Sequence, residues 1–549
     1  MRDKQRMHHQ LHKLGPERMH DVDDHLMTTF TLPDTASLLI AGGDSRIIPD
    51  PVTGKSKYGC RNIPEPQVLA FGSSTASTIS ERGMVAATAL QQRLTSELQA
   101  TPSSDAEAVY RQHASRLRSE IAASCGLSAS DEAEVLIAAS GTDIHLILAQ
   151  WLQVQRTIMI DSCETGSGLA AALQGRHFNQ ESTCNGQAPA HDLVSTWQAE
   201  LCLLPARQLN GDLADAAQTS ARLRQLTDDA ANAGKNVLLI LTDVSKTGLI
   251  FPDISTVLAL QQRWPGQVHV LVDACQFRIA PYTIRAYLAQ GFMLALTGSK
   301  FMTGPTFSGA LLLPQALVRR YQLQGLPEGV RAYSNAADWP ESLPAAQSLM
   351  SGHNFGLLLR WEAALAELRA FQQIDEPAAI RFIRQFGDTI RRRLAEDAHF
   401  SLLPTTSLRR SALHTHTGWD EEQTIFSFVL YQPDRPGVAS TTGTLDAPST
   451  PDCMYQQKLR KPLSRQDTQR IYLQLQQPSS EPARPGIALG QPVLCGERDG
   501  VPVSALRLCL SAPLLVAAQQ PEQASMILKN VIVAIDRMVE LIEALAYKN

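Results

Sequence analysis

Short apolar segments alternate with helical segments through the middle of the chain, and this alternation restricts the fold more than any other feature. The segments between them carry apolar residues at helical spacing, whereas the short segments themselves are aliphatic and of strand length. Strands and helices in alternation predict an α/β domain with a mainly parallel, doubly wound sheet. The expected strands are 134–140, 156–161, 236–243, 268–273, 292–297 and 309–314.

Two of these strands place an acid and a lysine where a ligand would bind. Asp273 ends the segment VHVLVD, and Lys300 follows the segment FMLALT in a turn of small residues. The carboxyl ends of parallel strands meet at one edge of the sheet, and open α/β sheets bind their ligands there. We therefore expect both side chains to line one site.

The residues around this pair resemble the class V aminotransferase and cysteine desulfurase group of fold-type I pyridoxal-phosphate (PLP) enzymes. A V-D-A-x-Q motif containing Asp273 and Gln276 is followed by the turn that ends in Lys300, then by G-P and a second glycine. The resemblance covers residues 75–375 and, patchily, 484–513. It implies a large domain with a seven-stranded type of sheet and a smaller α+β domain at the C-terminal side.

The resemblance implies pyridoxal 5'-phosphate as cofactor and assigns three residues to its reactive part. Lys300 would hold the aldehyde as a Schiff base and move protons. Asp273 would keep the pyridine nitrogen protonated, so that the ring works as an electron sink. Gln276 would bind the phenolic oxygen. An acid after an apolar strand also occurs in nucleotide hydrolases, but no G-x-x-x-x-G-K-[ST] phosphate loop is present.

The phosphate group is expected at the start of a helix, where free N–H groups attract an anion. The turn after the strand 134–140 contains Gly141 and Thr142, which match the family's phosphate turn, and Asp143 is the expected helix cap. Thr297 and Ser299 correspond to the family's polar residues before the lysine and would add hydroxyl donors.

Two further segments match the family. In TDVSKTG, Ser245 and Lys246 stand where the family carries a polar side chain beneath the cofactor. In MSGHNFG, His353 and Asn354 stand where the family reaches the phosphate of the other subunit. The second match implies a homodimer with the active site at the subunit interface.

Substrate-binding residues follow from the same resemblance and from the chain's departures from it. Arg507 stands where the family has an arginine for the substrate carboxylate, and a salt-bridged structural arginine is the alternative. Glu164 lies where relatives carry an aromatic residue over the ring, so it could act as acid or base or bind a substrate amine; His177 could replace the ring. Tyr58 and Arg61, like Arg46, lie in an irregular segment that folds over the substrate in relatives.

A leucine, Leu489, occupies the position of the nucleophilic cysteine of cysteine desulfurases, in RPGIALGQP. A leucine cannot accept a persulfide, and neither Cys495 nor Cys275 matches the motif. Desulfuration by that mechanism is therefore not expected.

Composition limits the partners and the location. The net charge is -5 and the chain has no basic excess, which excludes nucleic acid and an anionic membrane as main partners. The polar N-terminus lacks a secretory signal, and the nine cysteines form no CxxC pair, which favours a cytoplasmic protein without a zinc site. His414 and His416 have no third ligand in view, so we expect no metal.

The domain prediction follows from the order of these elements. We expect an N-terminal arm and irregular segment over 1–75, a large PLP-binding domain over 76–355, and a small domain over 356–549 with a polar insertion at about 432–485. The other expected helices are 81–98, 105–123, 357–371, 378–394 and 521–547, and the other expected strands are 424–431, 470–476 and 505–511.

The predicted function is that of a PLP-dependent enzyme acting on the amino group or Cα of an amino acid or related amine. An aminotransferase is the main prediction, and a C–S or β-elimination lyase or a decarboxylase is the alternative. A non-catalytic relative that serves as an interaction protein is the third possibility, although Lys300 and Asp273 are both retained.

Overall fold

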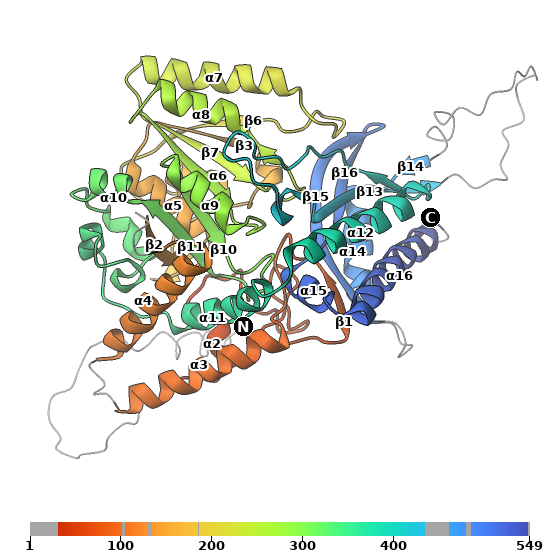
Figure 1. The fold of residues 1–549 in the computed structure, drawn as a ribbon, viewed down its shortest axis with the longest axis horizontal. Coiled ribbons are helices and arrows are strands. Elements are labelled where there is room, and N and C mark those ends of the chain that lie inside the picture. The colour runs from red at the N-terminus through yellow and green to blue at the C-terminus, as the bar shows by residue number, and fades with distance from the viewer. Residues whose placement is uncertain are drawn as a thin grey trace, which may run out of the picture.

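The computed structural model describes residues 31–100, 105–128, 133–184, 186–433, 460–478 and 485–546. Two mixed sheets lie side by side, each covered by helices, with the large sheet built from the middle of the chain and the second from its C-terminal part (Figure 1). Residues 1–30 of the predicted N-terminal arm, and residues 434–459 and 479–484 of the predicted insertion, lie outside the described residues.

The large sheet confirms the predicted doubly wound α/β domain. Its strands β10, β9, β7, β3 and β6 are parallel neighbours, whereas β11 runs antiparallel to both β2 and β10. All six predicted strands are present, and β6 is a strand that the sequence did not predict. The sheet order is β2 (Ala133–Ala138), β11 (Gly309–Pro314), β10 (Met293–Thr297), β9 (Val268–Ala274), β7 (Val237–Asp243), β3 (Arg156–Ile160) and β6 (Glu200–Leu204), with β8 (Ile250–Phe251) beside β7.

Helices cover both faces of this sheet, so its central strands are buried throughout. Along β7, Leu238 and Ile240 face one apolar layer, and Leu239 and Leu241 face the other. This explains why the central strands consist almost entirely of aliphatic residues instead of alternating with polar ones. The helices are α5 (Gly141–Leu152), α6 (Leu169–Leu173) and α10 (Gln315–Tyr321) on one side and α7 (Ala216–Asn232), α8 (Ile254–Arg263) and α9 (Pro281–Ala289) on the other.

The second sheet combines the C-terminal part of the chain with one strand from the N-terminal segment. β1 (Val68–Phe71) pairs in parallel with β15, whereas the other pairs are antiparallel. The sheet order is β1, β15 (Gly486–Arg498), β16 (Val501–Cys509), β13 (Ile425–Pro433) and β12 (Phe400–Leu402), with β14 (Arg460–Pro462) beside β13. Its helices are α12 (Glu376–Ala395), α14 (Arg465–Leu475), α15 (Ala512–Ala517) and α16 (Pro521–Ala546).

One predicted strand, 470–476, is wrong, because these residues belong to helix α14. Ser464 caps the helix by accepting a hydrogen bond from the backbone N–H of Asp467. The buried residues Ile471, Tyr472 and Leu475 have helical spacing, and they pack into the core of the second sheet. The alternation I-Y-L-Q-L-Q therefore resembles a strand although the segment is a helix. Part of the predicted polar insertion belongs to the folded domain.

Helix α11 (Phe355–Phe371) is buried along most of its length between the two sheets, and it supports the loop that carries Lys300. A side chain at Gly298 or Gly304 would place its Cβ 2.5 or 2.6 Å from the Cβ of Ala364, so only glycine allows this loop to lie on the helix. Helices α2 (Thr35–Leu39), α3 (Glu81–Ala100) and α4 (Ala106–Ser124) pack against α11. No helix in the described part of the chain is long and apolar enough to cross a bilayer.

Candidate active site

Lys300 lies three residues after β10, at the carboxyl edge of the large sheet. Its carbonyl oxygen accepts hydrogen bonds from the Thr303 backbone N–H at 2.9 Å and from the Ser77 hydroxyl at 3.4 Å, which fix the loop. Within the described residues, its amine has no ion-pair or hydrogen-bond partner. The backbone is therefore anchored while the amine remains available for a ligand.

Asp273 lies at the end of β9, next to the strand that leads to Lys300. Its Oδ1 accepts a hydrogen bond from the Cys275 backbone N–H, and its Oδ2 lies 3.9 Å from Nε2 of His145. His145 is 1% exposed, and this ring nitrogen has no hydrogen-bond partner. A buried histidine beside the predicted carboxylate was not found from the sequence, although its position four residues after Gly141 places it on the first turns of α5.

The segment Ser73–Ser77 passes over this edge of the sheet and contacts several predicted residues. Gln276 donates a hydrogen bond from Nε2 to the Ser74 carbonyl oxygen at 2.9 Å, while its buried Oε1 has no partner. Thr75 accepts hydrogen bonds from Arg507 Nη2 at 2.8 Å and from a backbone N–H of β15 at 3.0 Å. Because the Thr75 hydroxyl accepts from two donors, its own proton remains available for a ligand.

Helix α5 begins at the same edge and offers an anion site. Ser140 caps the helix, while the N–H groups of Gly141 and Thr142 have no acceptor within the helix. A Cβ on Gly141 would lie 2.8 Å from Sγ of Cys275, so glycine is required for the helix to begin this close to the strand that carries Asp273. Asp143 is fully buried, and burial raises the pKa of its carboxyl group.

The two predicted hydroxyl residues before Lys300 lie in different settings. Thr297 donates its hydroxyl proton to the Cys275 carbonyl oxygen at 2.6 Å, so this hydroxyl can offer a ligand only its lone pairs. Ser299 is buried beside Lys300 and its hydroxyl forms no hydrogen bond with the other described residues.

PLP fits this arrangement of residues. Three groups are left without partners at one edge of the sheet: the Lys300 amine, the Gln276 amide oxygen and Nε2 of His145. Unpaired buried polar groups are rare in folded proteins, and a bound ligand is one way in which they gain partners. The carboxylate of Asp273 supplies the negative charge that a protonated pyridine needs. The start of α5 supplies the positive end of a helix dipole, which a phosphate needs.

Arg507 is buried on β16, and its guanidinium faces the same region. It donates to the Gln491 carbonyl oxygen at 2.5 Å, to the Thr75 hydroxyl and to the Lys246 carbonyl oxygen at 3.3 Å. Nε has no partner, and within the described residues the guanidinium forms no ion pair. Burial lowers the pKa of Arg507. The predicted alternative, a salt-bridged structural arginine, finds no carboxylate at ion-pair distance among the described residues.

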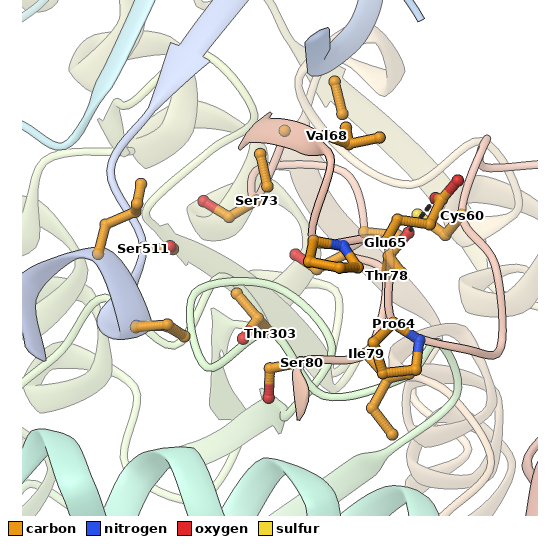
Figure 2. A pocket seen from close by; sticks show the side chains of 18 of the residues that line it. Cys60, Pro64, Glu65, Val68, Ser73, Thr78, Ile79, Ser80, Thr303 and Ser511 are labelled. Atoms are coloured by element: carbon orange, nitrogen blue, oxygen red, sulfur yellow. Dashed lines mark hydrogen bonds between the residues drawn. The ribbon is translucent and has the colours of Figure 1, made fainter. Parts of the chain in front are cut away.

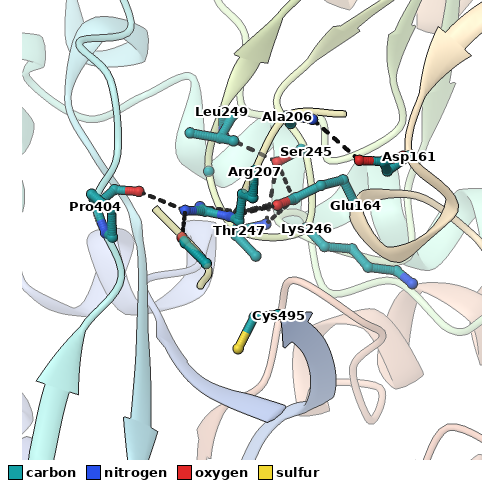
Figure 3. A network of polar contacts seen from close by, with 12 residues as sticks. Asp161, Glu164, Ala206, Arg207, Ser245, Lys246, Thr247, Leu249, Pro404 and Cys495 are labelled. Atoms are coloured by element: carbon teal, nitrogen blue, oxygen red, sulfur yellow. Dashed lines mark hydrogen bonds and ion pairs between the residues drawn. The ribbon is translucent and has the colours of Figure 1, made fainter. Parts of the chain in front are cut away.

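Glu164 is held inside a polar network rather than directed at the site (Figure 3). Its carboxylate accepts hydrogen bonds from the hydroxyls of Ser245 and Thr247 at 2.7–2.8 Å and from Nε of Arg207 at 3.0 Å. These donors occupy the oxygens that a substrate amine would need, so the network fixes the turn after β7. Ser245, predicted to lie beneath the cofactor, donates its hydroxyl proton to this carboxylate.

Lys246 follows Ser245 in the same turn, and its side chain extends away from the Glu164 network (Figure 3). Burial and the positive charges of Arg507 and Lys300 lower the pKa of Lys246 to about 8. The turn therefore contributes one anchored hydroxyl and one amine without a partner among the described residues.

The irregular N-terminal segment brings Tyr58 but not Arg61 toward the phosphate turn. Tyr58 lies close to Arg46, and burial raises the pKa of Tyr58. Arg46 pairs with Asp44 at 2.7 Å and lies 3.5 Å from the Ser140 hydroxyl that caps α5. Arg61 is 39% exposed and pairs with Glu65 at 3.2 Å, away from these groups.

The remaining predicted cofactor residues lie at the start of α11. Asn354 caps this helix, since its Oδ1 accepts the Leu357 backbone N–H and its Nδ2 donates to the Gly42 carbonyl oxygen at 2.8 Å. His353 is exposed and packs edge-on against Phe355. His177, the alternative ring residue, lies 2.5 Å from the Tyr333 hydroxyl.

A cavity of about 580 Å³ lies beside the Lys300 loop, between the N-terminal segment and helices α14 and α15 (Figure 2). Neither Lys300 nor Asp273 lines it, although Ser77 and Thr303, which hold the Lys300 carbonyl oxygen, do. It is therefore a neighbour of the candidate site and not the site itself.

No protein-family model and no curated protein matches this sequence. Solved structures do match, and they define the fold as that of fold-type I PLP-dependent enzymes, which confirms the resemblance at the level of the fold. A C-DES mutant with glycine covalently linked to its PLP cofactor aligns with a TM-score of 0.51 and 16% identity, covering 85% of this chain and 99% of that one.

Two further similar structures belong to the cysteine desulfurase group. A NifS-like protein from Rickettsia africae aligns with a TM-score of 0.49 and 11% identity over 86% of this chain and 99% of that one. The cysteine desulfurase CsdA from Escherichia coli aligns with a TM-score of 0.46 and 16% identity over 86% of this chain and 95% of that one.

Proposed function

We propose that this protein is a PLP-dependent enzyme that acts at the Cα of an amino acid. The observation that carries the proposal is the meeting of an unpartnered lysine amine, a buried carboxylate and a helix N-terminus at one edge of the large sheet. When bound, PLP supplies an electron sink for the charge that develops at Cα.

Each residue has a distinct task in this proposal. The Lys300 amine would hold the cofactor and, when free, would take the proton from Cα. Asp273 would stabilise the positive charge of the pyridine nitrogen, and Gln276 would bind the phenolic oxygen. The backbone N–H groups of Gly141 and Thr142, with the hydroxyl of Ser299, would bind the phosphate. Arg507 holds the substrate carboxylate, because its buried guanidinium has no carboxylate of the protein to pair with.

For the reaction type we propose β-elimination at a C–S bond. The C-DES protein is described as a cystine C-S lyase, and elimination needs no cysteine nucleophile. Leu489 is buried in β15, and burial raises the pKa of Cys495 to about 11, so neither position offers a reactive thiolate. The Lys300 amine would take the Cα proton, and the electron pair left at Cα would form a Cα–Cβ double bond while the C–S bond breaks with its own pair on sulfur. The proton then leaves with the thiol. Water then releases ammonia and a 2-oxo acid.

Transamination, the main prediction from the sequence, remains the competing reaction, because it uses the same lysine as proton carrier. The two differ in their products: elimination releases a thiol and ammonia, whereas transamination releases a 2-oxo acid without ammonia. The decarboxylase and the non-catalytic protein remain predictions, as does the cytoplasmic location.

We also propose a homodimer whose interface lies at the start of α11. His353 is exposed there, whereas Asn354 is already engaged in capping the helix. His353 is therefore the better of the two predicted ligands for the partner subunit's cofactor.

The absorption spectrum of the purified protein with added PLP tests the proposal. We expect a visible band that borohydride bleaches with covalent retention of the cofactor, and we expect the Lys300→Ala protein to retain none. Mixing with S-methyl-L-cysteine should release methanethiol and ammonia with return of the band. Release of a keto acid without ammonia would establish transamination, and a protein that binds no PLP would overturn the proposal.

A further inference from the structure

Three basic side chains surround the place in which the amino acid would bind. Lys300 follows β10, Lys246 lies in the turn after β7, and Arg507 lies on β16. Arg507 Nη1 donates a hydrogen bond to the Lys246 carbonyl oxygen at 3.3 Å, so these two residues are in direct contact. Both Arg507 and Lys300 act electrostatically on the Lys246 amine. The three cations therefore belong to one site, although they come from three separate elements.

None of the three pairs with a carboxylate in the part of the chain that the structure describes. A buried cation without a carboxylate can be satisfied by backbone carbonyl oxygens, as Arg507 is in part. Arg360, which is fully buried, donates to the carbonyl oxygens of Leu39, Ala41, Gly42 and Phe307. The amine of Lys246 has no such acceptor within the described residues, which distinguishes it from a structural cation.

The nearest acid cannot neutralise Lys246 without breaking other contacts. Glu164 acts electrostatically on Lys246, but its oxygens already accept hydrogen bonds from Arg207, Ser245 and Thr247. The Lys246 side chain extends away from that carboxylate (Figure 3). A positive charge held in a partly desolvated site without a protein counter-ion favours an anionic ligand.

We propose that the substrate carries a second acidic group on its side chain, which Lys246 binds while Arg507 binds the α-carboxylate. The inference rests on the proposed function, because Lys300 is then engaged by the cofactor and two cations remain for two anions. The substrate class is an amino acid with a side-chain carboxylate or a comparable acid. Lys246 determines specificity, and Lys300 remains the residue that moves the proton.

Matched pairs of amino acids test this proposal with the full-length, PLP-loaded protein at pH 7. The pairs are S-carboxymethyl-L-cysteine with S-methyl-L-cysteine, and L-glutamate with L-glutamine, so that either reaction type is detected. We expect kcat/KM to be greater for the acidic member by about tenfold or more, and this ratio to fall about tenfold in Lys246→Met. Lys235→Met is the control, because Lys235 is an exposed lysine near Glu200 and precedes β7, at the opposite end of this strand from Lys246. This variant should keep the ratio.

A second measurement does not depend on turnover. Glutarate has two carboxylates and no amino group, so it binds without reacting. Calorimetry should show its dissociation constant rising about tenfold in Lys246→Met and remaining unchanged in Lys235→Met.

Three outcomes decide the matter. A wild-type preference for the neutral members would overturn the inference and leave the proposed function intact. An equal loss with acidic and neutral substrates in Lys246→Met would also overturn it, because Lys246 would then not distinguish an acidic side chain from a neutral one. Lys246-dependent glutarate binding in a protein that takes up no PLP would support the two-anion site and would overturn the proposed function alone.

Discussion

Replacing Lys246 with methionine is expected to stabilise the cofactor-free protein at pH 7. Burial, with the charges of Arg507 and Lys300, lowers the pKa of Lys246 from 10.5 to about 8. One pKa unit corresponds to about 1.4 kcal/mol, so the protonated lysine lowers the free energy of unfolding by about 3 kcal/mol. Methionine fills a similar volume without the charge and removes this cost.

The effect has a defined pH dependence. Because the pKa is lower in the folded state than in the unfolded state, the full cost is present below pH 8 and disappears as the pH rises toward 10.5. The stability difference between Lys246→Met and the wild type should therefore fall from about 3 kcal/mol at pH 7 to about 1 kcal/mol at pH 9.5.

Guanidinium chloride unfolding followed by circular dichroism at these two pH values measures the difference. Lys235→Met, whose side chain is 44% exposed in the wild type, should stay within about 0.5 kcal/mol of the wild type at both. Equal stability of Lys246→Met and the wild type at pH 7, or a difference that does not change with pH, would refute the argument that Lys246 is a desolvated cation.

Three other substitutions test other parts of the site and fold. Asp273→Asn should still bind PLP but lose about 10²- to 10³-fold in kcat, because the pyridine nitrogen loses its negative partner; unchanged turnover would remove Asp273 from the mechanism. Arg507→Ala should raise KM for amino acids about 10- to 100-fold and leave that for simple amines nearly unchanged, and an equal effect on both would point to another anchor. Arg410→Met should lower the free energy of unfolding by about 3–5 kcal/mol, because Arg410 donates to both oxygens of fully buried Asp243 at 2.6 and 2.8 Å; a loss below 1 kcal/mol in a denaturant titration would contradict this.

The edge of the large sheet that carries the candidate site could be predicted from the sequence, because it depends on local patterns. Asp273 and Lys300 each follow an aliphatic segment, and the alternation of strands with helices places the ends of such segments together. Strand β6 was missed because ELCLL is short and carries a charge at its start. Helix α14 was missed because the alternation I-Y-L-Q-L-Q is typical of a strand, although Ser464 stands at the capping position before the helix.

The remainder of the site depends on contacts that no local pattern records. Glu164 was predicted to face the substrate, and only the fold shows that Arg207, from a distant loop, occupies its carboxylate. His145 belongs to the site because Asp273 of β9 lies beside it, and Thr75 because Arg507 of β16 donates a hydrogen bond to it. Lys246 could be recognised from the sequence as a polar residue in a family motif. Its cationic neighbours, Lys300 after β10 and Arg507 on β16, could not, because the fold brings them together from distant parts of the chain.

The pairing of β1 with β15 has a consequence for the order in which the protein can be completed during its synthesis. Val68 pairs with Gly486, so an early strand has no partner until the ribosome has translated roughly 400 more residues. Ser74 and Thr75, which receive the hydrogen bonds of Gln276 and Arg507, follow this strand directly. The large domain can therefore fold while the chain is still growing, but the contact between Thr75 and Arg507 forms only after β16 has been synthesised. We expect binding of the proposed cofactor to be one of the last events in the protein's maturation.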